Sequence, residues 1–191
     1  TGSMLGVASL FIVFMSTMYS PVVNSRHHML LSRLQGANLT AAIATTTLAA
    51  DADPHWPQPV RQLALLYFTS NDNRFLETAR RAVALAPHSQ ALHREMARLC
   101  FQAEHAAEAL KLYKRAVELY PNSALTRAEL AYLHSLGKRD DEAAKEAAEA
   151  LRLDKLNPHP EQKLRNQTIL GLGGRPAGEN AEHVARGLRK K

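Results

Sequence analysis

The spacing of apolar residues along the chain predicts a protein built almost entirely from helices. Residues 4–23 form a tract without a single charged residue, and beyond residue 26 apolar positions recur every three or four residues. This spacing places side chains on one face of an α-helix, whereas a strand would alternate apolar and polar residues. We therefore expect an all-α protein.

The apolar tract over residues 4–23 has the length of a membrane-spanning helix. At 1.5 Å per residue such a helix covers about 30 Å, the thickness of a bilayer core. A signal peptide is the alternative, but no Lys or Arg precedes the tract and no small-residue cleavage site follows it. Arg26 and Arg33 follow the tract, which places the remainder in the cytoplasm by the positive-inside rule. The sequence thus predicts a membrane protein with a single span in this chain. The remainder of the chain, which contains the sequence repeats described below, is expected in the cytoplasm.

Residues 24–55 are predicted to form a helical linker or a partial repeat. Gly36 is expected to weaken or bend this helix, and Pro54 ends it because proline cannot donate a helical hydrogen bond. Its apolar and small residues keep to one helix face: Leu30, Leu34, Ala37, Ala41, Ala44 and Leu48.

A period of 33 or 34 residues relates three later stretches, 56–87, 88–121 and 122–158. Small residues recur at fixed places, and Pro87 and Pro121 close the first two stretches. The matched sets are Ala64, Ala97 and Ala131; Ala82, Ala116 and Ala150; and, in the last two stretches, Ala109 and Ala143. In the first stretch Phe75 replaces the last of these small residues. A chance match at this many positions is not expected.

This pattern resembles the tetratricopeptide repeat (TPR), which has a period of 34 residues. The resemblance implies three helix-turn-helix repeats stacked into a short α-solenoid. In TPR proteins, small residues allow the two helices of a repeat to approach closely. The expected architecture is therefore a transmembrane helix followed by a TPR-like solenoid over residues 56–158.

The resemblance also implies a peptide-binding groove lined by the first helix of each repeat. Carried over by position, its candidate residues are Arg61, Phe68, Arg94, Arg98, Phe101 and Tyr132. Three arginines among aromatic rings indicate a protein partner or an acidic peptide, because a guanidinium can grip a carboxylate with two parallel hydrogen bonds. The alternative is that the arginines pair with Glu95, Glu129 or solvent, and that the aromatic rings pack between helices.

The sequence holds no constellation typical of an enzyme, a cofactor site or a metal site. Cys100 is the only cysteine, and its position indicates a small buried residue. His93 and Glu95 resemble half of a deaminase signature, but the paired cysteines are missing. We therefore expect no catalytic residue, no cofactor and no bound metal in this chain.

The chain carries a net charge of +6, and residues 159–191 hold much of it. This stretch has seven Lys or Arg against three Glu and is predicted to be a flexible basic tail. It could contact nucleic acid, although it has no aromatic residue between its charges, so nucleic-acid binding is not favoured.

Two functional hypotheses follow from this layout. The first is a membrane-anchored TPR scaffold that holds a protein partner at the cytoplasmic face. The second is that the chain is the C-terminal part of a multi-spanning protein, because a last span followed by degenerate repeats is similar to the layout of bacterial O-antigen ligases and polymerases. In that case the parent protein would be a glycosyltransferase whose catalytic residues lie upstream.

Overall fold

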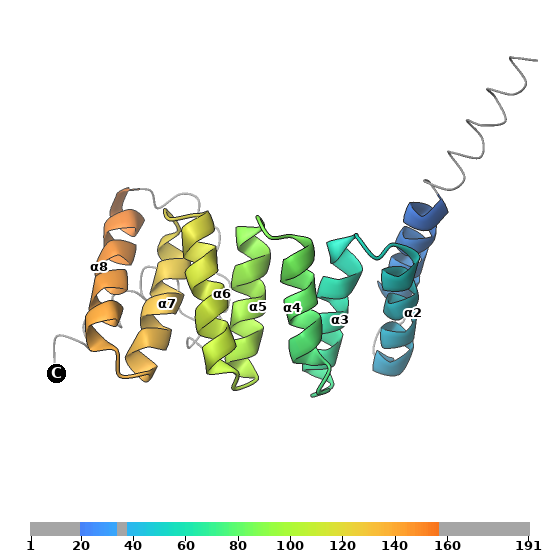
Figure 1. The fold of residues 1–191 in the computed structure, drawn as a ribbon, viewed down its shortest axis with the longest axis horizontal. Coiled ribbons are helices and arrows are strands. Elements are labelled where there is room, and N and C mark those ends of the chain that lie inside the picture. Colours follow the sequence, from blue (N-terminus) through green and yellow to red (C-terminus); the bar gives the residue numbers. More distant parts are fainter. Residues whose placement is uncertain (1–19, 34–37, 157–191) are drawn as a thin grey trace, which may run out of the picture. The chain divides into compact units, whose positions relative to one another are not determined.

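The computed structural model describes residues 20–33 and 38–156, and all regular structure in these two ranges is α-helical (Figure 1). One helix covers residues 20–33. The others are α2 (Leu39–Ala52), α3 (Pro57–Thr69), α4 (Phe75–Leu85), α5 (Gln90–Gln102), α6 (Ala106–Leu119), α7 (Ala124–Leu136) and α8 (Asp140–Leu156).

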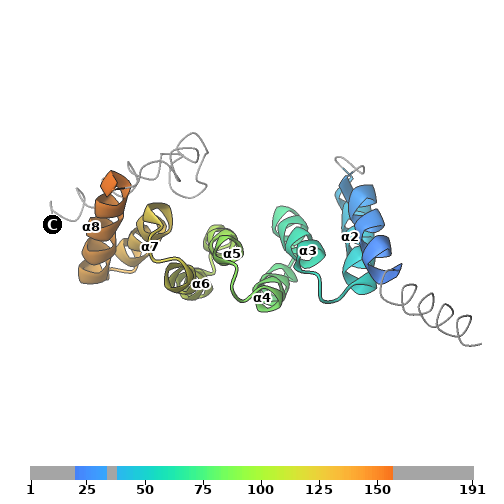
Figure 2. The same cartoon turned by 90° about the horizontal axis from the view of Figure 1, so that it is seen from above.

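The chain divides at Ala86 and Pro87 into two compact units. Unit 1 contains the helix over residues 20–33 together with α2, α3 and α4. Unit 2 contains α5 to α8, in which α6 packs against both α5 and α7 (Figure 2). In both units, helices adjacent in sequence are also neighbours in space, as expected for stacked helix-turn-helix repeats.

The backbone between the two helices of each repeat follows one pattern. Asn71, Glu104 and Lys138 all adopt left-handed conformations, with φ of 52°, 63° and 56°. In each case the following residue donates its N–H to the carbonyl five positions earlier, at 2.8, 2.8 and 3.0 Å. This is the hydrogen bond of a Schellman motif, which satisfies a carbonyl at the end of the first helix. The sequence repeat is thus also a repeat of backbone conformation.

The starts of α5 and α7 are defined by serines 34 residues apart. Ser89 accepts a hydrogen bond from the N–H of Leu92 at 3.3 Å, and Ser123 accepts one from Thr126 at 3.2 Å. Both are N-caps that satisfy a donor left free in the first helical turn. The proline two residues before each serine ends the preceding segment, so each new helix begins at a fixed place.

The small residues of the repeat lie in the cores of the two units. All eight alanines of the three matched sets have no exposed surface: Ala64, Ala82, Ala97, Ala109, Ala116, Ala131, Ala143 and Ala150. Between α7 and α8, Ala131 packs with Ala147 and Ala128 packs with Ala150. In the first repeat the buried Phe75 takes the position of Ala109 and Ala143, and its ring contacts Phe68. A larger residue there needs a rearranged neighbourhood, because packed interiors do not absorb extra volume freely.

The stretch predicted to be one helical linker contains a helix pair. The helix over residues 20–33 packs on α2 through buried polar groups. The Ser25 hydroxyl donates to the carbonyl of Ala49 at 2.6 Å, and the hydroxyls of Ser32 and Thr46 are 2.6 Å apart. Since residue 25 meets residue 49 and residue 32 meets residue 46, the two helices run antiparallel. Asn38 caps α2 by accepting from the N–H of Ala41 at 3.0 Å.

The prediction of an N-terminal membrane span is wrong as part of the fold. Within residues 20–33 and 38–156, no helix combines the length and the apolar character that a bilayer crossing requires. Residues 4–19 of the expected span lie outside the described residues. Residues 20–23 begin a helix that also carries Arg26 and Arg33 and buries Ser25 and Ser32 against α2. The same finding contradicts the membrane localisation that we inferred from the span. The predicted basic tail, residues 159–191, also lies outside the described residues.

The first testable prediction concerns the close packing of α7 on α8. We expect Ala131→Leu to lower the free energy of unfolding by about 1–3 kcal/mol, because the added atoms have no space between two helices that meet at alanines. Ala148→Leu, at an exposed position of α8, is the matched control and should change it by less than about 0.5 kcal/mol. Urea unfolding followed by circular dichroism measures both. Equal effects would contradict the packing argument.

The second prediction concerns His134, a residue that is 3% exposed and whose Nδ1 is buried without a hydrogen-bond partner in the described part of the chain. Burial lowers its pKa below the ordinary 6.5, and the charges of Arg139 and Lys114 act in the same direction, against Glu142 and Glu146. The unfolded chain therefore binds the proton more tightly, so stability is lost as pH falls below about 6.5.

We expect His134→Gln to reduce the difference in free energy of unfolding between pH 7.5 and pH 5.5. The exposed His88 provides the control, since His88→Gln should leave that difference unchanged. Urea unfolding at the two pH values is the measurement. An unaltered pH difference in His134→Gln would contradict the assignment.

Candidate functional site

Three side-chain contacts join α5 and α7 along their length. Gln90 donates to the hydroxyl of Thr126 at 2.9 Å, Arg94 binds Glu129, and the rings of Phe101 and Tyr132 meet edge to face. The contacts progress in the same direction on both helices, so α5 and α7 run parallel. We call this surface the α5–α7 seam, defined by Gln90, Arg94, Arg98, Phe101, Gln102, Thr126, Glu129 and Tyr132.

Arg94 and Glu129 form the polar centre of the α5–α7 seam. Arg94 donates from Nε to Oε2 at 2.8 Å and from an Nη to Oε1 at 3.2 Å. The Glu129 side chain is fully buried, while that of Arg94 is 20% exposed. A carboxylate this buried needs a bound cation, and the planar guanidinium supplies two aligned donors. Arg94 therefore binds an internal carboxylate, which is the alternative that the sequence left open for it.

Arg98 and Gln102 lie one helical turn apart on α5 and carry unsatisfied polar atoms. Arg98 Nε and Gln102 Oε1 are both buried, and neither has a hydrogen-bond partner among the residues that the structure describes. One is a donor and the other an acceptor, so together they match an amide or carboxyl group of another molecule. Arg98 also lines a hollow of about 210 Å³ with Ala91, Arg94 and Glu95.

The aromatic pair of the α5–α7 seam combines packing with partial exposure. The ring centroids of Phe101 and Tyr132 are 6.0 Å apart, and the ring planes meet at 87°, a geometry favoured by the ring quadrupoles. Tyr132 also packs against Ala131 and Ala147. Both rings remain partly exposed, so they contribute to the interior of unit 2 and to its surface.

The other two candidate residues, Arg61 and Phe68, lie on α3 in unit 1. The Phe68 ring contacts Phe75 at 5.6 Å between centroids, at an angle of 60°, so it packs α3 on α4. Arg61 lines a pocket of about 400 Å³ in unit 1. The structure thus brings Arg94, Arg98, Phe101 and Tyr132 together in unit 2 and places Arg61 and Phe68 in unit 1.

Most residues of the unit 1 pocket could not be identified from the sequence. Arg26 and Arg33 were interpreted as charges flanking a membrane span, and Trp56 was not singled out as a candidate site residue. The full lining is Arg26, Met29, Leu30, Arg33, Trp56, Gln58, Arg61 and Gln62. One signal in the sequence could have indicated the difference from unit 2. Gln62 lies two residues before Ala64, which is the first alanine of the matched set Ala64, Ala97 and Ala131. Two residues before the other alanines of this set, the sequence has Glu95 and Glu129.

Titratable residues in the described ranges do not gather into a metal site. No three His, Cys, Asp or Glu side chains of these ranges are placed to hold a metal ion, and Cys100 is a buried cysteine. Tyr113, beneath the α5–α7 seam on α6, has a pKa raised well above its ordinary value, first by burial and then by the charge of Glu129. The phenol therefore stays neutral over the physiological pH range.

The third prediction tests the Arg94–Glu129 pair with a double-mutant cycle. We expect Glu129→Met alone to lower the free energy of unfolding by about 3 kcal/mol, because it leaves the guanidinium without its buried carboxylate. Arg94→Met together with Glu129→Met should recover to within about 1 kcal/mol of wild type, since both polar groups are then gone. Additive losses in the urea unfolding of the four proteins would show that the two residues are not coupled.

Comparison with known proteins supports the repeat over part of unit 2. Residues 90–133, which cover α5, α6 and most of α7, match the family described as the tetratricopeptide repeat. No curated protein sequence matches the chain. The similarity in layout to O-antigen ligases and polymerases finds no support in these comparisons.

Several solved structures share the fold at low sequence identity. A MamA crystal structure is 16% identical, covers 87% of each chain and has a TM-score of 0.61. MamA from Desulfovibrio magneticus is 14% identical, with 87% of this chain and 94% of that one covered and a TM-score of 0.59. PilF of Pseudomonas aeruginosa is 18% identical, with 90% and 76% covered and a TM-score of 0.57. The chain therefore has the all-α helical-repeat fold of these proteins, and its residues 90–133 match the tetratricopeptide repeat.

Proposed function

We propose that this chain is a non-enzymatic TPR-type scaffold that binds a protein partner along the α5–α7 seam. The observation that carries the proposal is the pair of buried, unsatisfied atoms Arg98 Nε and Gln102 Oε1. A buried polar atom without a partner is costly, and such atoms are uncommon in folded proteins. A bound polypeptide would supply both a carbonyl or carboxylate acceptor and an N–H donor.

The aromatic rings beside these atoms support a polypeptide as the occupant. Phe101 follows Arg98 by three residues on α5, and Tyr132 contacts it from α7. Aromatic and Arg side chains at the centre of an interface contribute much of its binding free energy. Arg94 is not assigned to partner binding in this proposal, because Glu129 already binds its guanidinium. Its role is to hold α5 against α7.

The fourth prediction tests the α5–α7 seam with a photo-crosslinking amino acid at Leu136. This residue is 54% exposed and lies one turn beyond Tyr132. In cells that express the protein, we expect this probe to give a discrete protein adduct. Adding Arg98→Glu should reduce the yield by about tenfold, because a partner acceptor would then face a negative charge. Mass spectrometry identifies the adduct, and circular dichroism checks that Arg98→Glu remains folded.

The matched control places the same probe at Lys111, an exposed residue of α6. It should not give this adduct. The proposal fails if Lys111 yields the same adduct as efficiently as Leu136, or if Arg98→Glu leaves the yield at Leu136 unchanged while the protein stays folded.

A further inference from the structure

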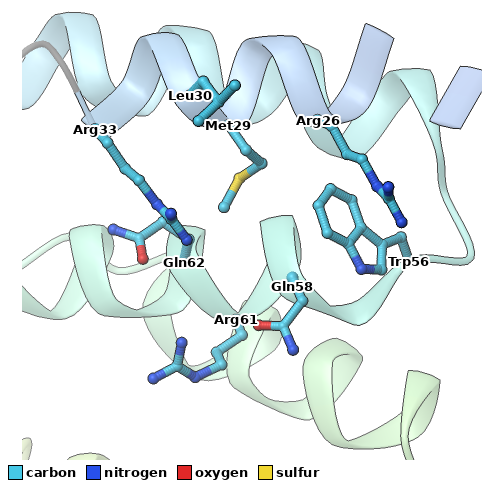
Figure 3. Close-up of a pocket in the computed structure, with 8 residues that line it drawn as sticks. All are labelled: Arg26, Met29, Leu30, Arg33, Trp56, Gln58, Arg61 and Gln62. Carbon is cyan, nitrogen blue, oxygen red and sulfur yellow. The ribbon is translucent and has the colours of Figure 1, made fainter. Parts of the chain in front are cut away.

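The unit 1 pocket lies between two helices of the same unit. The helix over residues 20–33 supplies Arg26, Met29, Leu30 and Arg33, while α3 and the residue before it supply the other lining residues. In Figure 3 the Arg26 side chain lies beside the Trp56 ring, and Arg33 extends toward Gln62. Three of the eight lining residues are arginines and none is acidic. Arg26 and Arg33 therefore lie in a lining that holds no carboxylate.

Aligning the repeats shows why the lining of the unit 1 pocket has arginines but no carboxylate. Glu129 stands two residues before Ala131, and its carboxylate is bound by Arg94 with two hydrogen bonds. The residue two positions before Ala64 is Gln62, which lines the unit 1 pocket. An amide can accept a hydrogen bond but cannot neutralise a guanidinium. Where unit 2 provides an internal carboxylate, unit 1 provides a neutral side chain of the same length.

The apolar residues of the lining indicate that a molecule bound in the pocket also carries an apolar group. The Met29 side chain is nearly buried, whereas Leu30 is 58% exposed, and Trp56 is partly exposed beside Arg26. A bare inorganic anion would use only the guanidinium groups. A polypeptide that places a carboxylate next to an apolar side chain would use both, and arginine forks match carboxylates in shape as well as charge.

We propose that the unit 1 pocket binds an acidic peptide segment, taking a Glu or Asp carboxylate at Arg26 and Arg33 and an adjacent apolar side chain against Met29 and Trp56. The occupant's carboxylate supplies the charge that Gln62 lacks. This site is separate from the α5–α7 seam. It gives the protein a second binding surface, which prefers a carboxylate next to an apolar side chain.

The test uses the whole chain and a fluorescein-labelled hexapeptide of alternating glutamate and leucine, measured by fluorescence polarisation. We expect this peptide to bind at least about tenfold more tightly than its glutamine–leucine counterpart, because the pocket recognises the charge. The decisive variant is Gln62→Glu, which places a carboxylate inside the pocket. It should weaken peptide binding by about tenfold or more, because the internal group competes for the arginines.

Two controls separate this effect from charge and from misfolding. Ala44→Glu makes the same charge change at an exposed position of α2 and should leave the affinity within about twofold, because surface charges away from the pocket are screened. Arg26→Gln combined with Arg33→Gln should weaken binding as Gln62→Glu does, and both residues are exposed. A raised or unchanged melting temperature in Gln62→Glu would show that the fold is retained.

Four results would overturn the proposal. The first is equal affinity of folded Gln62→Glu and wild type for the acidic peptide, and the second is equal affinity of wild type for the two peptides. The third is binding of inorganic phosphate or phosphatidylserine vesicles without binding of the acidic peptide. The fourth comes from Arg98→Glu, which distinguishes the two sites. If it alone abolishes peptide binding, the peptide occupies the α5–α7 seam, so the pocket proposal fails while the scaffold proposal stands.

Discussion

Close contact between helices at alanine positions is the constraint on which the rest of this fold depends. Each repeat has small residues where its two helices meet, and these residues have no exposed surface. Because Cβ atoms rather than long side chains set the distance between the helices, that distance can vary only within a narrow range. That spacing brings Arg94 within hydrogen-bonding distance of Glu129 and lets Phe101 meet Tyr132. The polar seam is therefore a consequence of the alanine contacts below it.

The repeat, its small core residues and its helical class could all be predicted from the sequence, because they depend on periodic local chemistry. Ala97 and Ala131 must be small for the same reason, so they recur at the same place. The partner of Arg94 could not be chosen from sequence, since Glu95 and Glu129 were both available. Only the packing of α5 beside α7 selects Glu129. Arg61 and Phe68 likewise match the groove by position, yet the structure places Phe68 against Phe75.

The prediction of a membrane span near the N-terminus was wrong because it considered only the apolar content of the tract and not the helices that pack against its end. The tract over residues 4–23 is uncharged, but the helix that begins at residue 20 continues through Ser25, Arg26 and Ser32 and packs on α2. Nothing in the sequence shows that Ser32 will contact Thr46, because small polar residues are also common on protein surfaces. Arg26 and Arg33, interpreted as membrane-flanking charges, instead line the unit 1 pocket with α3.

The hydroxyl-mediated contact between the helix over residues 20–33 and α2 has a thermodynamic consequence for unit 1. Apolar burial gives unfolding a large positive heat-capacity change, whereas polar burial makes an opposite contribution. An interface built from Ser25, Ser32, Thr46 and alanines therefore separates with a small heat-capacity change. Its strength varies with temperature less steeply than that of the alanine and leucine core between α7 and α8. Local opening of this helix pair, and amide hydrogen exchange through it, then has its own temperature dependence within the same chain.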